Sequence, residues 1–412
     1  MVNFNGQNGC IKCTTVGEYS YNSHCNIFPI NGCEPRTDEG FRSRIYEGHH
    51  KCDSPLEMLP INMIDQFPVG DSLHLIHLGI TKRCLMGWRD GSFRNHRLKW
   101  CAQDIQHISI FLVSCQLPSE IHRAVRGLDC LAFWKALEYR TFFLYIGIVV
   151  LKKYLPNDVY EHFLLLFCFV TICTTKYYSH FLDLADELMK YYLINFKNIY
   201  GKDFMTSNIH NLSHLIEDVR KFGPLPSFST YPFENKLYEI KYMLRGRKNP
   251  LAQAARRLGE MSAIENLCVE SSSNIYFVPL SKPIDKKLIT NIQNCPFPLQ
   301  ETTFFEKVEL NNNCFLSTEN KNSWFLTKQN KIVRLKFITR YIDMIKIHGR
   351  PLKQISNFFE TPINSSYLNI FCSNCIEDSE QMYNLNEIKC KLVMIKFDIN
   401  LSVFIPLLHS FQ

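Results

Sequence analysis

The chain lacks a recognisable export signal, and this absence decides how its cysteines are interpreted. It begins with MVNFNGQNGC, which has neither the basic nor the apolar region of a secretory leader. Without export, a reducing compartment is expected, where disulfides are rare. The 17 cysteines, an odd number, are therefore predicted to be mostly buried thiols with a few metal ligands, and not a disulfide framework.

A second absence is that of a long apolar run. The most apolar stretches are residues 142–151 and 163–173, and both fall short of the roughly 18 residues that a membrane span requires. Charged side chains separate the two stretches, namely Lys152, Lys153, Asp158 and Glu161. We therefore predict two buried core helices joined by a short turn, and no membrane partner.

Neither sign of charge is in large excess. The formal net charge is +7 over 412 residues, which is compatible with a polyanionic partner without requiring one, because clustering matters more than the total. Hydrophobic residues make up 46% of the chain and aromatic residues 13%, a composition that excludes extensive disorder. The length predicts two or three domains.

Composition shifts along the chain predict its organisation. Residues 1–70 are rich in Gly, Asn, Pro and Cys and would need an external organiser such as a metal. Residues 71–204 are predicted to be a helical domain in which Asp71 or Ser72 caps the first helix. Residues 205–272 continue as helices. The helices after the first are expected at 99–117, 138–154, 158–175, 179–200, 207–221, 231–246 and 250–268.

Residues 273–412 are predicted to form a β-rich C-terminal domain. Asn-rich loops, such as the one at Asn311, Asn312 and Asn313, separate short β-prone runs, beginning with residues 275–278. Residues 324–327 and 332–337 are expected to pair as a hairpin, and residues 392–397 and 401–405 as another. The fold class is therefore mainly α with a β-rich C-terminal domain.

Two short motifs carry candidate metal ligands. Cys10 and Cys13 form a CxxC pair, which places two thiolates on one side of a tight turn, as tetrahedral zinc requires. His210 and His214 are four residues apart, so on a helix they share a face. The pairs are about 200 residues apart, and local spacing does not establish whether they bind one ion; an HxxxH pair by itself is more often a surface or interface pair.

Five blocks in order across residues 5–260 resemble the CACTA-type (EnSpm-like) transposases, in the form of truncated or domesticated insect copies. Residues 5–13 (NGQNGCIKC) resemble the segment KGHxGYxxCxxC, and residues 36–42 (RTDEGFR), with His49-His50 and residues 54–56 (SPL), resemble the block after it. Residues 67–79 (FPVGDSLHLIHLG) resemble FPLDxMHLxxLG. The remaining matches are residues 208–225, similar to NxHxLxHLxxxxxxFGPL, and residues 231–237 (YPFENKL), similar to FPFENxL.

The resemblance implies an RNase H-like nuclease core with a large helical insertion before a late glutamate. In that plan two aspartates and one glutamate hold two Mg²⁺ ions for phosphodiester cleavage and strand transfer, and Glu234 matches the glutamate. The order CxxC, paired histidines, glutamate is similar to that of the V(D)J recombinase catalytic subunit. The resemblance thus implies structural zinc on Cys10, Cys13, His210 and His214.

The chain departs from the family pattern at the catalytic aspartates. Both precede the CxxC pair in the family, and the nine residues before Cys10 include no acid. Asp71 does not replace them, because Asp71-x-x-His74 matches a separate signature, and the family's Gly-His is Gln7-Asn8 here. One carboxylate of three should bind Mg²⁺ poorly. We therefore expect a catalytically incomplete protein; an active nuclease is the alternative if a longer chain supplies the missing segments, and Mg²⁺ is expected only then.

DNA is the partner implied by the family, with a nuclear location and a possible homo-oligomer. Residues 230–260 carry seven basic side chains against Glu234, Glu239 and Glu260, a net of +4, and such side chains contact phosphates. The basic residues are Lys236, Lys241, Arg245, Arg247, Lys248, Arg256 and Arg257. A solvated basic face is the plain alternative, and a protein-interaction scaffold without nucleic-acid binding is a third hypothesis.

Simpler interpretations stay open for the other candidates. Asp71 fits a helix N-cap, and Glu234 fits an ordinary surface position. A second CxxC pair, Cys372 and Cys375, has only Cys390 nearby as a further ligand and fits buried or turn thiols better than a second zinc site. Packing or hydrogen-bonding roles are the more common ones for four further histidines, His49, His50, His74 and His77.

Overall fold

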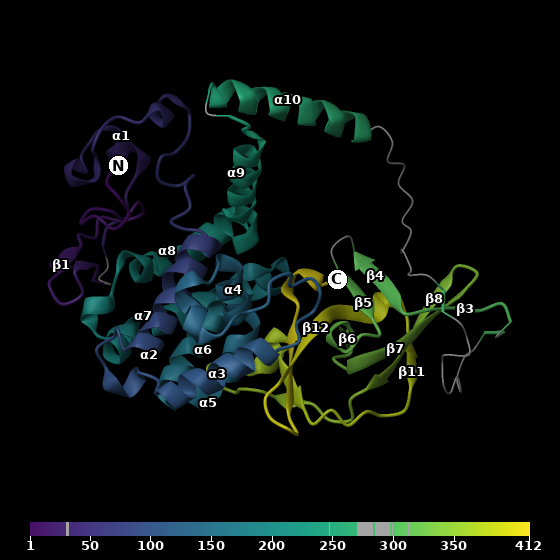
Figure 1. Cartoon of the computed structure of the whole chain (residues 1–412). Helices are drawn as coiled ribbons and strands as arrows, with labels where there is room; N and C mark the ends of the chain where they lie inside the picture. Colours follow the sequence, from purple (N-terminus) through teal and green to yellow (C-terminus); the bar gives the residue numbers. More distant parts are fainter. Residues whose placement is uncertain (30–32, 247, 270–282, 285–296, 299, 312–313) are drawn as a thin grey trace.

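The chain is mainly helical from residue 72 to residue 269, and its last third is a β-sheet (Figure 1). The computed structural model describes the chain except residues 30–32, 247, 270–282, 285–296, 299 and 312–313. The division into a helical part and a β-rich part confirms the coarse fold class. The β-prone run at 275–278 lies outside the described residues, as do Asn312 and Asn313.

Residues 1–70 contain little regular structure. A short hairpin joins β1 (Glu18–Ser20) to β2 (Cys25–Ile27), and one helical turn, α1 (Asp38–Arg42), follows. The apolar cluster of this segment contains only Phe41, Met63 and Ile64 as fully buried members. A core of that size stabilises a fold weakly, so the segment depends on contacts with the helical body.

The helical body begins at Asp71, whose carboxylate caps the first helix by accepting the backbone N–H groups of Leu73 and His74. This helix, η3 (Ser72–Thr81), is wound as a π-helix and continues as α2 (Lys82–Asp90). The wider π winding differs from the α-helix that apolar periodicity predicts, since periodicity does not distinguish the two windings. The remaining helices of the body are α3 (Ala102–Ser114), α4 (Ala136–Thr141), the π-helical η6 (Phe142–Ile146), α5 (Gly147–Tyr154), α6 (Asn157–Thr174), α7 (Leu182–Tyr200) and α8 (Ser207–Phe222).

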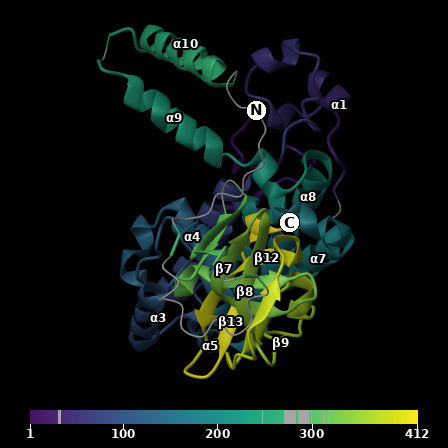
Figure 2. The same cartoon turned by 90° about the vertical axis from the view of Figure 1, so that its right-hand side faces the viewer.

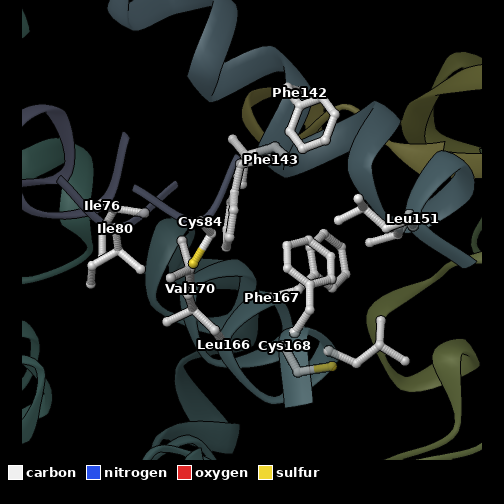
Figure 3. Close-up of a cluster of buried hydrophobic side chains, with 14 of the residues drawn as sticks. Ile76, Ile80, Cys84, Phe142, Phe143, Leu151, Leu166, Phe167, Cys168 and Val170 are labelled. Carbon is white, nitrogen blue, oxygen red and sulfur yellow. The ribbon is translucent and has the colours of Figure 1, made fainter. Parts of the chain in front are cut away.

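The two apolar stretches form the centre of the core. They lie in η6–α5 and in α6, which a short turn at Leu155 and Pro156 joins as expected. Figure 3 shows side chains of η3, α2, η6, α5 and α6 gathered in one cluster; Phe143 and Phe167 lie in it with ring centroids 6.1 Å apart. Burying each such side chain contributes about 1.5–3 kcal/mol. Among the described helices, none combines the length and apolar character needed to span a membrane.

Two helices project from the body. After α8 the chain turns through η9 (Leu225–Phe228) into α9 (Tyr231–Met243) and then α10 (Pro250–Val269). Figures 1 and 2 both show this pair standing away from the remaining helices. No residue of α9 is buried.

The β-rich part is a nine-stranded antiparallel sheet with a separate hairpin beside it. The order is β11-β8-β7-β6-β12-β13-β10-β9, with β3 also paired to β7, and β4 pairs with β5. The strands are β3 (Thr303–Phe305), β4 (Lys307–Asn311), β5 (Cys314–Ser317), β6 (Trp324–Thr327), β7 (Ile332–Tyr341), β8 (Met344–Pro351), β9 (Ser356–Asn357), β10 (Phe371–Ser373), β11 (Gln381–Tyr383), β12 (Ile388–Lys396) and β13 (Ser402–Pro406). Both predicted hairpins are confirmed, as β6–β7 and β12–β13.

One face of the sheet packs directly on the helices. Along β12, Val393 and Ile395 belong to the same buried cluster as α5 and α6, whereas Leu392 lies on the opposite face with Phe404 and Trp324. This alternation follows from the two-residue period of a strand. The helical body and the sheet therefore share one continuous apolar core.

A buried ion pair joins the two parts at their edge. Lys391 on β12 is fully buried, and its Nζ lies 2.8 Å from a carboxylate oxygen of Glu120, in the loop after α3. The ammonium also donates to Asn322 and to the carbonyl of Phe315. Burial lowers the pKa of Lys391, and Glu120 partly offsets this effect.

Candidate metal centre

The structure brings the four sequence-predicted ligands together. The Cys10 Sγ lies 3.5 Å from the Nε2 of His214, and the Cys13 Sγ lies 3.3 Å from the Nε2 of His210. The two sulfurs are 3.5 Å apart. All four ligand atoms lie within 4.8 Å of one another although the pairs are separated by about 200 residues in sequence.

Local structure places the two cysteines on one side of a turn and the two histidines on one side of a helix. Cys10 and Cys13 lie in a turn in which the Cys13 N–H donates to the Cys10 sulfur at 3.4 Å. His210 and His214 occupy successive turns of α8, so both imidazoles face the sulfurs. Cys10, Cys13 and His210 are buried, and His214 is half-buried.

An ion pair beside the sulfurs docks the cysteine turn on α8. Lys12 lies between the two cysteines, and its Nζ is 2.9 Å from the Oδ1 of Asp218, two turns after His210 on the same helix. The other oxygen of Asp218 accepts the backbone N–H of Val69. The same helix face therefore holds both the imidazoles and the anchor of the cysteine turn.

Buried groups complete the surroundings of the sulfurs. The Arg36 Nε donates to the Cys10 carbonyl at 3.1 Å, and Phe28 packs against the His210 ring with centroids 5.6 Å apart. Thr15 Oγ1 lies 3.1 Å from the Cys13 sulfur. The hydrogen bond between the two sulfurs lowers the pKa of Cys13 and raises the pKa of Cys10, so the cysteine pair shares one proton when no metal is bound. A metal ion bound to both sulfurs would displace that proton.

The spacing of the donor atoms fits a tetrahedral metal ion. Zn–S and Zn–N bonds of about 2.3 and 2.0–2.1 Å place the ligand atoms of a tetrahedral site about 3.3–3.8 Å apart. The sulfur–nitrogen and sulfur–sulfur distances given above, 3.3, 3.5 and 3.5 Å, fall within that interval. The cluster could thus hold a metal ion, and two sulfur and two nitrogen donors are typical of zinc or iron.

Glu234 and Asp71 have different surroundings. Glu234 is an exposed residue in the first turn of α9. Asp71 is buried and accepts hydrogen bonds from the Thr230 backbone and hydroxyl as well as capping η3. Burial by itself would raise the pKa of Asp71, but the hydrogen bonds from Thr230 and His74 outweigh it and lower the pKa. Asp71 therefore links the start of η3 to the residue before α9.

The described basic residues proposed for DNA lie on the projecting helices α9 and α10 and in the turn between them. Three of them are engaged in ion pairs along their own helices: Lys236 with Glu239, and both Arg256 and Arg257 with Glu260. Lys241, Arg245 and Lys248 are exposed. Arg247 lies outside the described residues.

A basic groove that the sequence patterns do not indicate lies beside the metal centre. It has a volume of about 740 Å³ and is lined by Lys82, Arg83 and Arg94, with aromatic rings at Phe4 and Tyr19 and no acidic residue among its described lining. Asp203, an acid next to this region, accepts hydrogen bonds from Ser20 and Asn22, and the charges of Lys202 and Arg94 also act on its carboxylate. Lys82 and Arg83 are adjacent on α2 and Arg94 follows shortly after that helix, whereas Phe4 and Tyr19 come from the N-terminal segment, so the groove as a whole is assembled from distant parts of the chain.

The other candidate ligands have hydrogen-bonding partners and join no metal group in the described residues. The His49 Nδ1 lies 2.7 Å from the Asn8 carbonyl, and the His50 Nδ1 lies 2.8 Å from an Arg44 nitrogen. Cys372 contacts the Ser356 hydroxyl at 3.2 Å. The described cysteines are free thiols, several of them buried, as at Cys168 and Cys173, and others exposed, as at Cys33 and Cys101.

The comparison with known proteins found a match only for the β-rich part of the chain. Residues 288–407 match the family described as Domain of unknown function (DUF8592). No curated protein matches the chain, and no solved structure does. The matched span lies entirely after the four candidate ligands, so it does not bear on the metal centre.

Proposed function

We propose that the chain is a transposase-derived zinc protein that binds DNA and does not cleave it by itself. One observation carries the proposal: the donor atoms of two cysteines and two histidines about 200 residues apart converge within 4.8 Å, and three of their distances lie in the range of a tetrahedral site. These are the same four residues for which the resemblance to CACTA-type transposases implies zinc. An RNase H-like core stays part of this proposal.

Zinc in this site would have a structural role. Four protein donors fill a tetrahedral shell and leave no position for substrate. The burial of three of the four ligands supports a closed site. The ion would fasten residues 1–70, which have a small core of their own, to α8.

Two basic surfaces support DNA as the partner. The groove beside the metal centre combines three cations with exposed Phe4 and Tyr19, and such rings stack on bases while lysine and arginine contact phosphates. Lys241 on α9, and Arg245 and Lys248 in the turn between α9 and α10, are exposed and add positive charge. The groove is favoured as the main contact because no carboxylate in its described lining offsets its charge.

The carboxylates present do not support two-metal cleavage. Glu234, the residue that matches the family's glutamate, is exposed, and among the described residues the cysteine–histidine cluster is the sole candidate metal group. A two-ion mechanism needs several carboxylates around both ions. We therefore expect no cleavage of DNA by this chain in Mg²⁺; if the aspartate-bearing segments were supplied in a longer chain, cleavage would be expected.

The test is a DNA-binding titration at two salt concentrations. We expect the double variant Lys82→Glu/Arg94→Glu to bind duplex and single-stranded DNA at least tenfold more weakly. The slope of its salt dependence should fall by roughly one unit for each phosphate that the variant no longer neutralises. The matched control, Lys328→Glu/Lys353→Glu, reverses two exposed lysines of the β-rich part and should bind like the unaltered protein. Absence of salt-dependent binding, or an equal reduction in both variants, would favour the scaffold hypothesis instead.

A further inference from the structure

A small cavity at the base of α9 has the chemistry of an anion site. Its volume is about 190 Å³, and it lies among η3, α4, η6, α6 and the loop that leads into α9. Leu144, Val170 and Leu225, all at most 3% exposed, form an apolar floor. The other lining groups are mainly hydrogen-bond donors, so the cavity combines an apolar surface with polar groups, as small-molecule sites do.

Arg140 supplies a positive charge that no protein acid neutralises in the part of the chain described. The Glu138 carboxylate on the same helix is occupied by Arg126, at 2.8 and 2.9 Å. Arg140 itself makes no ion pair or hydrogen bond with any described residue, and its guanidinium lies over the Tyr231 ring at 5.7 Å. A half-buried guanidinium presents five N–H donors in a planar fork that matches carboxylate and phosphate oxygens.

Asp71, an acid whose charge acts on His77 and Tyr231, already has hydrogen-bond donors at both carboxylate oxygens. Its two oxygens accept hydrogen bonds from Thr230, Leu73 and His74. It does not line the cavity, and none of the described residues that do is acidic. Asp71 therefore does not compete for Arg140 as a close partner.

His77 adds a neutral donor directed at the cavity. It is 2% exposed, and its Nδ1 lies 2.9 Å from the Tyr231 hydroxyl. Burial, and next the charge of Arg140, lowers the pKa of His77 to about 3, so the ring is neutral at pH 7. Burial raises the pKa of Tyr231, which keeps its proton. In the tautomer in which that hydroxyl donates to Nδ1, the N–H of His77 is on Nε2, which has no partner among the described residues.

Two buried hydroxyls complete the donor set. Ser72 and Ser229 are 8% and 6% exposed, and their Oγ atoms lie 3.1 Å apart on the cavity wall. A pair of hydroxyls can keep one hydrogen bond to each other and donate the second proton to a ligand. The cavity wall thus offers Arg140, His77 and a serine hydroxyl to one oxyanion.

We propose that this cavity binds the anionic head of a small ligand, a carboxylate or a phosphate group, with the apolar floor receiving the remainder of the molecule. The site is separate from the metal centre and from the basic groove, and it does not depend on the function proposed above. Because Tyr231 begins α9, an occupied site would connect this projecting helix to η3 and α4.

Calorimetric titration at constant ionic strength tests the proposal, with inorganic phosphate and benzoate as probes. We expect saturable binding of at least one probe, and the tighter of the two identifies the head group. Arg140→Met should weaken this binding at least tenfold, whereas Arg97→Met, which removes an exposed arginine elsewhere, should leave it unchanged. Ser229→Val should also weaken binding, and it provides a second reading if Arg140→Met does not fold. No saturable heat from either probe, or equal affinity in the two arginine variants, would overturn the proposal.

Discussion

At the candidate metal centre, the ion pair between Lys12 and Asp218 holds the cysteine turn against α8. Lys12 reaches the buried carboxylate of Asp218 while Cys10 and Cys13 face the imidazoles of the same helix. The turn is therefore held at two places, one ionic and one through the ligands. A buried acid without its cation is costly, because its charge stays desolvated.

Removing one ligand should release the metal and unfold the N-terminal segment. We expect Cys10→Ser and His214→Ala each to reduce bound zinc well below one ion per chain and to lower the melting temperature, because structural zinc contributes about 10–16 kcal/mol of apparent binding free energy. Metal analysis and thermal melting measure both effects. Cys101→Ser, which alters an exposed thiol, is the control; a full complement of zinc in the ligand variants would contradict the site.

A second prediction about individual side chains concerns the buried ion pair between Lys391 and Glu120. Lys391→Met should destabilise the protein by about 3–5 kcal/mol, because Glu120 would remain buried without its cation. The double variant Lys391→Met/Glu120→Gln should recover part of that stability. Urea unfolding measures both values. A strictly additive destabilisation in the double variant would show that the two side chains do not interact.

Among the helices and strands, Asp71 connects two helices that are far apart in sequence. Its carboxylate caps η3 and accepts hydrogen bonds from the residue before α9. The prediction of an N-cap is correct, and the contact with Thr230 explains in addition why a buried carboxylate stays ionised. That Asp71 has a function beyond capping, as part of the signature Asp71-x-x-His74, stays a hypothesis.

Replacing Asp71 should cost stability in a pH-dependent way. Asp71→Ala should lower the free energy of unfolding by about 1–2 kcal/mol at pH 7, the upper range for removal of a cap. Because the pKa of Asp71 is lowered in the folded protein, its contribution is present above the unfolded pKa of about 3.9 and disappears as the pH falls through the folded pKa.

Unfolding measured between pH 7 and pH 3 checks this dependence. The difference between Asp71→Ala and the unaltered protein should shrink at the acidic end. A difference that stays constant with pH would indicate that the carboxylate charge contributes nothing.

Across the whole molecule, stability is distributed unevenly. The helical body and the sheet share one apolar core, whereas residues 1–70 have a small cluster and depend on α8. Local unfolding is expected where few apolar contacts oppose it. The boundaries at residues 204 and 272 remain predictions, although the core is continuous across the later one.

Metal removal should therefore act on one part of the molecule. Treatment with a chelator at pH 7 is expected to increase amide hydrogen exchange in residues 1–70 and at the start of α8, and to leave β6, β7, β12 and β13 unchanged. Hydrogen-exchange mass spectrometry gives this comparison directly. Uniform exchange before and after chelation would show that no ion fastens the segment.

The amino-acid sequence alone was enough to predict the elements whose patterns are local. The apolar periodicity predicted α6 and α7 close to their observed bounds, Gly223-Pro224 ends α8 at the expected place, and alternation predicted both hairpins. The sequence also identified Cys10, Cys13, His210 and His214 as candidate ligands by the type and local spacing of their side chains. Each of these patterns extends over only a few residues. Within so short a segment, positions in the sequence determine how far apart the residues lie in the structure.

Which distant residues meet depended on the packed fold. It brought Cys13 to His210, placed Phe4 and Arg94 in one groove, and put Lys391 beside Glu120. It also set the strand order, in which β11 pairs with β8 at the sheet edge, and gave η3 its π winding. Such contacts depend on how whole helices and strands pack, and no pattern within a short window specifies that packing.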